Sequence, residues 1–323
     1  MTITILDDYQ NVVRELKCFS LLNKQSVQVF NTTEKDIRVL SEKLRSTEIL
    51  VLIRERTKIS ESLLSLLPNL KLISQTGKIS NHLDLAACTK HGVAVAEGIG
   101  SPIAPAELTW ALLMNTVRLI PQAIEGMKIG KWQTNIGSTI HGKTIGIWGY
   151  GKIGQKIAQY AKVFGANVLV FGSERSKEKA IADGYSCAES KDIFFRTVDI
   201  LTLHLRLNEE TFGIVKESDL MSMKENAVLI NTARAELIEE GKLLKCLKLG
   251  KPAFAGVDVY EEEPIYDQNM PFLKLPNVVC TPHLGYVEKS GYELYFEKAF
   301  ENAVNFINGE PTNISNPEVF AKA

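Results

Sequence analysis

The sequence predicts an α/β protein with two doubly wound domains, each a parallel sheet covered by helices. Three observations support this. The 323 residues exceed the size at which a single core keeps growing. Short apolar runs alternate with helix-like segments along most of the chain. The alternation also restarts after a proline-containing break, "SPIAPAELTW", at residues 101–110.

The first series of apolar runs predicts five strands. They are "TITIL" (2–6), "SVQVF" (26–30), "TEILVLI" (47–53), "LKLISQTG" (70–77) and "VAVAEG" (93–98). Helical segments such as "SESLLSLLP" lie between them, which is typical of parallel strands joined by crossover helices.

The break at residues 101–110 leads into the longest apolar helix that we expect, "ELTWALLMNTVRLIPQAIEGM", residues 107–127. Pro102 and Pro105 suit a crossover and a helix start. We therefore place a domain boundary here.

The second series predicts six further strands. They are "KTIGIW" (143–148), "NVLVF" (167–171), "DILTLHL" (199–205), "AVLINTA" (227–233), "AFAGVDVY" (253–260) and "NVVCTPHLG" (277–285). A helical segment, residues 286–310, and a polar tail follow. The simplest organisation is discontinuous: residues 101–284 form one domain, and residues 1–100 with 285–323 form the other.

Composition narrows the class of protein. The net charge of −1 gives no basic excess for nucleic acid. The start "MTITILDDYQ" has no signal-peptide pattern, and no apolar run is long enough to span a bilayer. The five cysteines are scattered without a C-x-x-C pair, which favours reduced core thiols in a cytoplasmic protein over disulfides or zinc ligands.

The stretch "GIWGYGKIGQ" carries Gly149, Gly151 and Gly154 in the spacing G-x-G-x-x-G. Alone this spacing is weak evidence, but here it joins an apolar strand to a helix that ends at Gly165. The three glycines suit a tight turn, a close approach of pyrophosphate and close helix–strand packing. The context therefore predicts a Rossmann-like dinucleotide site.

The residue that usually selects NAD is a carboxylate at the end of the next strand. Here that strand ends at Gly172, and Glu174 lies two residues into the loop "GSERS". Ser173, Arg175 and Ser176 are suited to a 2′-phosphate instead. The cofactor is thus NAD or NADP, with a lean to NADP.

Three groups that follow later strands are candidates for chemistry. His283 lies in "TPHLG", Arg234 in "INTARAE" and Glu263 in "DVYEEEP". The carboxyl ends of parallel strands are where open sheets bind ligands. Singly, these side chains are better explained as a core histidine, a strand-end ion pair and a solvated acid.

Together, these segments resemble the D-isomer-specific 2-hydroxyacid dehydrogenase family. The resemblance rests on "GYGKIG", "LINTARAELIEE", "AGVDVYEEEP" and "TPHLG" in that order, with Arg234 and Glu263 29 residues apart and Glu263 and His283 20 apart. It covers nearly the whole chain, and "APAELTWALL" is similar to the family's domain-linking helix.

The resemblance implies two Rossmann-like domains with an active site in the cleft between them, where a 2-hydroxy acid and a 2-keto acid interconvert by hydride transfer. His283 would be the acid–base group, oriented by Glu263. Arg234 would hold the substrate carboxylate. The nicotinamide carries the hydride, so no metal is required. Residues 101–284 would bind the cofactor, and the discontinuous, flavodoxin-like domain would bind substrate.

The resemblance also extends the site. The expected cofactor-binding residues are Gly149, Gly151, Lys152, Ile153, Gly154, Ser173, Arg175, Ser176, His204, Arg206, Thr232, Ala233 and Asp258. The expected substrate-binding residues are Arg54, Gly77 and Lys78. A structural role at a strand end explains Asp258 almost as well as cofactor binding does. A position on the surface explains Arg54 about as well as substrate binding does.

Two departures from the family pattern bear on these assignments. Arg206 replaces the proline of the family's H-x-P, which places a cation near the expected adenosine end. Lys78 follows Gly77 directly in "SQTGKISNHLD", in a loop whose amides hold the substrate carboxylate in the family. The Lys78 side chain either adds a charge there or points to solvent.

The family is typically dimeric through a segment that includes residues 109–132, and we expect a homodimer. Two alternatives differ in chemistry. A formate-type dehydrogenase usually pairs the histidine with glutamine, against which Glu263 argues. A dinucleotide-sensing binding protein would keep the site without turnover.

Overall fold

The computed structural model describes residues 1–322, which form two compact units. Unit 1 contains Met1–Ser101 and the chain from Glu288 onward, and unit 2 contains Pro102–Val287. The divisions lie one residue and three residues beyond the expected ends at 100 and 284. The second falls there because the C-terminal helix begins only after Glu288, whose carboxylate accepts from the amides of Ser290 and Gly291.

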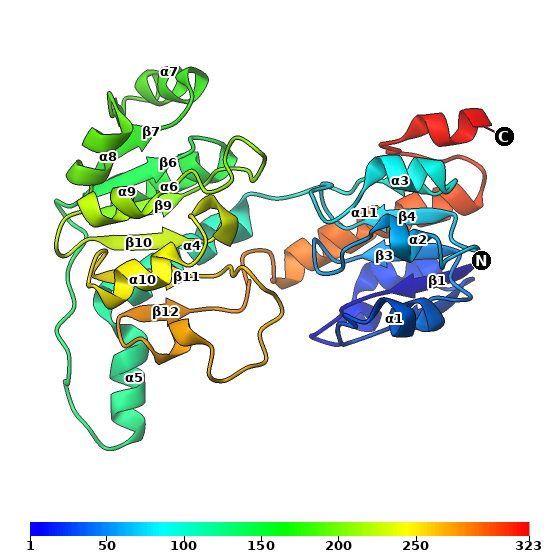
Figure 1. Cartoon of the computed structure of the whole chain (residues 1–323), viewed down its shortest axis with the longest axis horizontal. Helices are drawn as coiled ribbons and strands as arrows, with labels where there is room; N and C mark the ends of the chain where they lie inside the picture. Colours follow the sequence, from blue (N-terminus) through cyan, green and yellow to red (C-terminus); the bar gives the residue numbers. More distant parts are fainter. Residues whose placement is uncertain (323) are drawn as a thin grey trace. The chain divides into compact units, whose positions relative to one another are not determined.

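Unit 1 contains a five-stranded parallel sheet in the order β2-β1-β3-β4-β5 (Figure 1). The strands are β1 (Thr2–Ile5), β2 (Ser26–Val29), β3 (Ile49–Leu52), β4 (Leu72–Gln75) and β5 (Ala94–Ala96). β3 and β4 are buried along their whole length, which explains their uninterrupted apolar runs. The order 2-1-3-4-5 is the flavodoxin-like one.

Short helices connect these strands, and a long one returns from the C-terminal part of the chain. They are η1 (Val13–Glu15), η2 (Lys17–Leu22), α1 (Ile37–Lys43), α2 (Glu61–Leu64), α3 (Leu85–Lys90), α11 (Lys289–Ile307) and η5 (Pro317–Lys322). Asp36, Ser60 and Asp84 cap α1, α2 and α3 through side-chain oxygens. The tail after α11 pairs with β5 through an antiparallel bridge between Ala96 and Ile314.

Unit 2 contains a seven-stranded parallel sheet in the order β12-β11-β10-β9-β6-β7-β8. The strands are β6 (Thr144–Trp148), β7 (Asn167–Phe171), β8 (Ser186–Cys187), β9 (Ile200–Leu203), β10 (Val228–Asn231), β11 (Phe254–Val257) and β12 (Val278–Cys280). The short β8 is not among the expected strands. The order reverses between β6 and β9, and sheets of this kind bind ligands at the carboxyl ends of the strands at such a point.

Helices cover both faces of this sheet (Figure 1). They are α4 (Ile103–Arg118), α5 (Ile120–Lys128), α6 (Lys152–Val163), α7 (Glu174–Ala182), α8 (Lys191–Thr197), α9 (Glu217–Ser222) and α10 (Lys242–Lys248), with η3 (Ala235–Leu237) and η4 (Pro271–Lys274). One buried cluster includes Leu112 and Ile157, and another includes Phe194 and Leu247. These two clusters are the cores on opposite faces.

The expected single helix over residues 107–127 is wrong. The structure has two helices that divide at Leu119, whose backbone is left-handed (φ 55°). Pro121 explains the break, because proline lacks an amide hydrogen and its ring clashes with the carbonyl four residues earlier in a continuous helix. Pro121 lies instead in the first turn of α5, where it is tolerated.

Within residues 1–322, no helix combines the length and the apolar character needed to cross a bilayer.

Candidate active site

The expected cofactor and catalytic residues of unit 2 follow the carboxyl ends of its strands. The Gly149 loop follows β6, Gly172 follows β7 and His204 follows β9. The Arg234 segment follows β10, Asp258 follows β11 and His283 lies after β12. Because the strands are parallel, all of these groups lie along one edge of the sheet.

The glycine loop has the geometry that a dinucleotide phosphate group requires. Gly149 has a φ of 100°, and a methyl group there would lie 2.8 Å from the His204 carbonyl oxygen. A methyl group at Gly154 would lie 2.2 Å from the Gly149 carbonyl oxygen, whereas one at Gly151 would meet no atom within 4 Å. The backbone at Gly151 is therefore open, whereas the backbone at Gly149 and Gly154 is closely packed.

The helix after this loop, α6, has no side-chain cap at Gly151. The first amides of an uncapped helix have no intrahelical acceptor and attract anions. Lys152 and Ile153 lie in this first turn. The loop and the helix start thus fit a bound pyrophosphate.

The end of β7 differs from the loop that we expected. Glu174 is the first residue of α7, and its carboxylate pairs with the Lys177 ammonium at 3.0 Å. Ser173 is the N-cap residue but makes no cap bond; its hydroxyl lies 3.2 Å from the Ser176 hydroxyl. Gly172 contributes no side chain. The carboxyl end of β7 therefore leads into a helix without a side-chain cap, and the nearby Glu174 carboxylate is paired with Lys177.

The Arg234 segment is held by Asn231, the last residue of β10. The Asn231 side chain donates to the Arg234 carbonyl at 2.8 Å and accepts from the Ala233 amide at 3.0 Å. The Thr232 hydroxyl lies 2.6 Å from the hydroxyl of Thr109, which is fully buried on α4. The loop that carries Arg234 is thus anchored to both a strand end and a helix.

His283 and Glu263 are in direct contact. Nδ1 of His283 lies 2.6 Å from Oε2 of Glu263, and the other Glu263 oxygen accepts from the Tyr260 amide at 2.9 Å. The His283 ring also meets the Tyr286 ring edge-on at 5.4 Å. With Nδ1 engaged, Nε2 is the ring atom left for a ligand.

Asp258 holds the loop that carries His283. One carboxylate oxygen accepts from the Thr281 hydroxyl at 2.6 Å and the Leu284 amide at 2.8 Å, and the other accepts from the Gly285 amide at 3.0 Å. His283 itself has a left-handed backbone, φ 52°. Burial raises the pKa of Asp258, against the opposing effect of these bonds and of His283. These contacts support a structural role for Asp258, which is to hold the loop that carries His283.

His204 lies at the junction of β9 with the glycine loop. Its amide donates to the Trp148 carbonyl at 2.8 Å, and burial lowers the pKa of its ring to about 4. Nε2 of the ring is shielded from solvent and has no partner within residues 1–322. Arg206, two residues on, is exposed.

In unit 1 the structure brings together the three expected substrate-binding residues. Gly77 and Lys78 follow β4, and Arg54 follows β3 with a left-handed backbone, φ 53°. A methyl group at Gly77 would lie 2.1 Å from Nη1 of Arg54, so the guanidinium lies directly against the Gly77 backbone. Neither the Gly77 nor the Lys78 amide has an acceptor within the described residues. A cation and two available amides thus meet in one place.

Two supporting residues escaped the sequence analysis. Asn231 orders the Arg234 loop, and its sequence signal is an asparagine that ends a strand before a turn. Glu97 contacts the Lys78 loop from a distance of 19 residues, for which the sequence offers no local signal. Among the residues that the structure describes, no cluster of His, Cys, Asp and Glu suits a metal ion.

Comparison with known proteins identifies the family of the chain. The family model for the NAD binding domain of D-isomer specific 2-hydroxyacid dehydrogenases matches residues 110–285. The chain belongs to this family. Its membership confirms the resemblance and the α/β fold with two Rossmann-like sheets.

Individual relatives extend the likeness beyond that domain. A glyoxylate reductase of Thermococcus litoralis is 34% identical over 296 residues, which is 88% of each chain. The D-3-phosphoglycerate dehydrogenase of Methanocaldococcus jannaschii is 36% identical over 249 residues, but the chain spans only 47% of its length.

Solved structures give the same result for the fold. A phosphoglycerate oxidoreductase of Vibrio cholerae is 54% identical, with a TM-score of 0.94 over 96% of this chain and 99% of that one. An oxidoreductase of Ralstonia solanacearum is 49% identical, with a TM-score of 0.96 over 98% and 97%.

Proposed function

We propose that this protein is an NAD(P)-dependent 2-hydroxyacid dehydrogenase that interconverts a small 2-hydroxy acid and the corresponding 2-keto acid. The observation that carries the proposal is the 2.6 Å contact between His283 and Glu263, on the sheet edge that also bears the glycine loop. A dinucleotide site with a held acid–base pair beside it suits hydride transfer coupled to proton transfer.

A nicotinamide cofactor, when bound, would supply a hydride for the carbonyl carbon of the substrate. His283 would donate a proton from Nε2 to the keto oxygen, which receives the electron pair of the C=O π bond and becomes a hydroxyl group. Glu263 would accept from Nδ1 and orient the ring. The reverse reaction uses His283 as the base.

Arg234 and the Gly77 loop are assigned to the substrate carboxylate. A guanidinium presents a fork that matches a carboxylate and does not lose its proton. The Gly77 and Lys78 amides, beside the Arg54 guanidinium, offer further donors. We assign Asp258 to the His283 loop first, because its three contacts are all made to that loop.

The test is turnover. Purified protein is mixed with NADH or NADPH and a panel of 2-keto acids, including glyoxylate, hydroxypyruvate and pyruvate, and loss of nicotinamide absorbance is followed. We expect turnover with at least one acid and none with formate and NAD⁺. Tight cofactor binding without turnover on any acid would support the dinucleotide-sensing alternative.

We also propose that NADPH is accepted at least as well as NADH. The end of β7 lacks the carboxylate that would repel a 2′-phosphate, and Glu174 is paired with Lys177. Gly172→Asp should shift the preference toward NADH by about tenfold in kcat/KM, since an exposed like charge is screened. A methyl group at Gly172 lies 3.2 Å from Cβ of Ser176, so the variant needs only a slight shift. A wild type with strong NADH preference contradicts this proposal.

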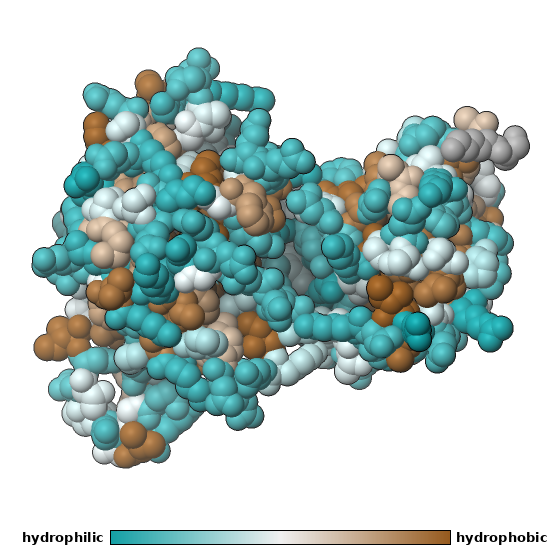
Figure 2. Space-filling view, in the orientation of Figure 1, coloured by the Kyte–Doolittle hydropathy of each residue, from teal (hydrophilic) through white to brown (hydrophobic). Residues whose placement is uncertain are grey.

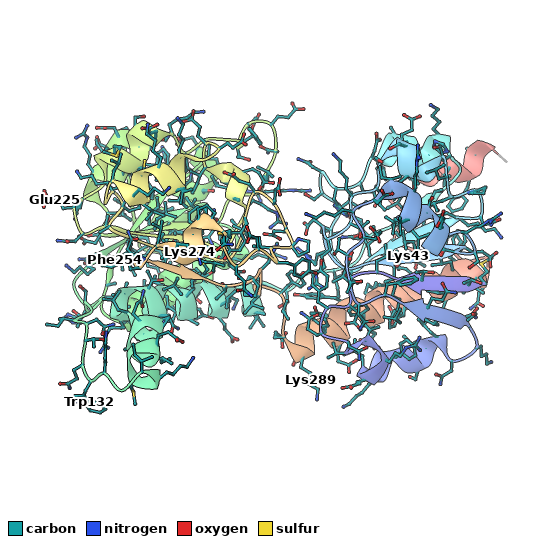
Figure 3. All side chains as sticks on the ribbon, turned by 60° about the horizontal axis from the view of Figure 1, so that its bottom comes forward. Lys43, Trp132, Glu225, Phe254, Lys274 and Lys289 are labelled. Atoms are coloured by element: carbon teal, nitrogen blue, oxygen red, sulfur yellow. The ribbon has the colours of Figure 1, made fainter. Side chains whose placement is uncertain are left out.

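A homodimer is the third part of the proposal. Large apolar side chains are exposed along α5 and the segment after it, and Trp132 is 74% and Ile136 94% exposed. Figure 3 places Trp132 at the outer end of this segment, and Figure 2 shows apolar side chains where α5 and its loop lie. Trp132→Asp with Ile136→Asp should yield a monomer in light scattering. Phe212→Asp, at an exposed site elsewhere, should not.

The cytoplasmic location expected from the scattered cysteines stays part of the proposal, and fractionation of cells that produce the protein tests it.

A further inference from the structure

The loop after β4 is braced by the segment that follows β5. The Gly98 amide donates to the Gly77 carbonyl at 2.9 Å. A methyl group at Gly98 would lie 2.4 Å from the Gln75 carbonyl oxygen, so the two segments are in direct backbone contact. The position of the Gly77 and Lys78 amides therefore depends on where residues 97 and 98 lie.

Glu97 fixes this loop through both carboxylate oxygens. Oε1 accepts from the Ile79 amide at 2.8 Å, and Oε2 accepts from the Lys78 ammonium at 2.7 Å. The Glu97 backbone is itself held, because its amide donates to the Asn313 carbonyl at 2.9 Å and its carbonyl accepts from the Asn302 side chain at 3.1 Å. The carboxylate is thus oriented from both sides.

The charges in this loop raise a difficulty that Lys78 resolves. A carboxylate next to an anion-binding loop repels the substrate carboxylate, and a counter-ion paired with it reduces that repulsion. The Lys78 side chain is 65% exposed, yet its ammonium returns to Glu97. Because the ammonium pairs with Glu97, its charge compensates that carboxylate and is not directed toward a substrate.

We propose that Glu97 is a positioning residue for the Gly77 and Lys78 amides, and that Lys78 is the counter-ion of Glu97 and not a direct ligand of substrate. The proposal rests on the proposed function of this loop. It means that the backbone amides of this loop bind the substrate carboxylate. The opposite charges of Glu97 and Lys78 compensate each other beside them.

The test is a double-mutant cycle over Lys78→Met and Glu97→Gln. Lys78→Met leaves the Glu97 charge uncompensated and should raise KM for the 2-keto acid roughly threefold to tenfold, with a much smaller change in kcat. Glu97→Gln keeps an acceptor for the Ile79 amide but removes the charge. In that background Lys78→Met should raise KM less than twofold, roughly the limit expected of a screened exposed charge. Higher ionic strength should reduce the effect of the single variant.

A matched ion pair at the other edge of the same sheet serves as control. The Lys71 ammonium lies 2.7 Å from Glu48, which also accepts from a backbone amide, that of Thr2, at 3.0 Å. Lys71→Met and Glu48→Gln should leave KM unchanged. They should lower the melting temperature about as much as Lys78→Met and Glu97→Gln do. This comparison separates an effect on the loop from general destabilisation.

Two outcomes would overturn the inference. An equal rise in KM from Lys78→Met in both backgrounds makes Lys78 a direct substrate ligand, and no rise in either makes the pair an ordinary surface contact. The dissociation constant of oxamate, measured by calorimetry with NADH present, gives the same cycle without turnover. A wild type that turns over no 2-keto acid but shows the cycle with oxamate would defeat the proposed function and retain this inference.

Discussion

The carboxyl edges of the two sheets carry different chemistry. In unit 2 the edge presents a titratable pair, His283 and Glu263, and an arginine on an anchored loop. In unit 1 the corresponding edge presents backbone amides at Gly77 and Lys78 beside the Arg54 guanidinium. Under the proposed function, the acid–base pair of unit 2 would move the proton, and the amides of unit 1 would position an anion. Substitutions of His283 and its supporting residues should therefore act mainly on kcat, and those in the Gly77 loop on KM.

The largest effect should come from the proton donor. His283→Ala should lower kcat by about 10²–10⁴-fold, which is the usual contribution of a positioned acid–base group. Cofactor affinity, measured by nicotinamide fluorescence, should change little. His141→Ala is the control, because this histidine contacts Gly165 in unit 2 and lies outside the site. Near-normal turnover of the His283 variant would move the proton transfer to another group.

Acid should destabilise unit 2 through His204. The pKa of His204 is about 4 in the folded protein, against 6.5 for an unperturbed histidine. Between these values the unfolded chain binds more protons than the folded protein does. The contribution of neutral, buried His204 to stability is therefore present above pH 6.5 and is lost as the pH falls to about 4. The loss should be about 3 kcal/mol in the free energy of unfolding.

The three tryptophans make this measurable. Trp110, Trp132 and Trp148 all lie in unit 2, so fluorescence-detected denaturation follows that unit. His204→Gln should flatten the pH dependence between pH 6.5 and 4. An unchanged slope in this variant would show that His204 becomes protonated without unfolding.

Arg234 tests whether geometry or charge alone binds the substrate in unit 2. Arg234→Lys keeps the charge but loses the guanidinium fork, and it should lower kcat/KM by about 10- to 100-fold, corresponding to one charge-assisted hydrogen bond. Both KM and kcat should change, because one group binds and polarises. Full activity in the lysine variant would show that charge suffices.

A smaller effect is expected from Asp258, which acts through the His283 loop. Asp258→Asn can retain only part of its three contacts, and kcat should fall by about tenfold with little change in cofactor affinity. Asp199→Asn is the control: this carboxylate accepts from the Thr144 amide at 2.8 Å at the amino edge of the same sheet. A selective loss of cofactor affinity in Asp258→Asn would assign this residue to the nicotinamide instead.

The sequence predicted the sheets of both units because parallel strands read as short apolar runs, and it predicted the site edge because their carboxyl ends coincide. It did not predict the break at Leu119, although Pro121 was a sufficient signal. It placed Glu174 in a loop, whereas the residue begins α7 and pairs with Lys177.

Other features of the site depend on contacts between distant residues. Glu97 and Lys78 meet across two strand ends, and Asp258 reaches the His283 loop from 27 residues away at Gly285. Neither contact leaves a periodic pattern in the chain. The sequence therefore suggested which groups could react, and the structure added which groups hold them.

The most direct test of the central claim is kcat for 2-keto acid reduction, compared between the wild type and Glu263→Ala. The claim is that His283 donates the proton from a ring that Glu263 holds in place. Removal of the Glu263 carboxylate leaves Nδ1 without its partner, so kcat should fall by about 10- to 100-fold, the loss of one charge-assisted hydrogen bond, with little change in cofactor affinity. An unchanged kcat in this variant would contradict the account, because the 2.6 Å contact would then have no part in the proton transfer.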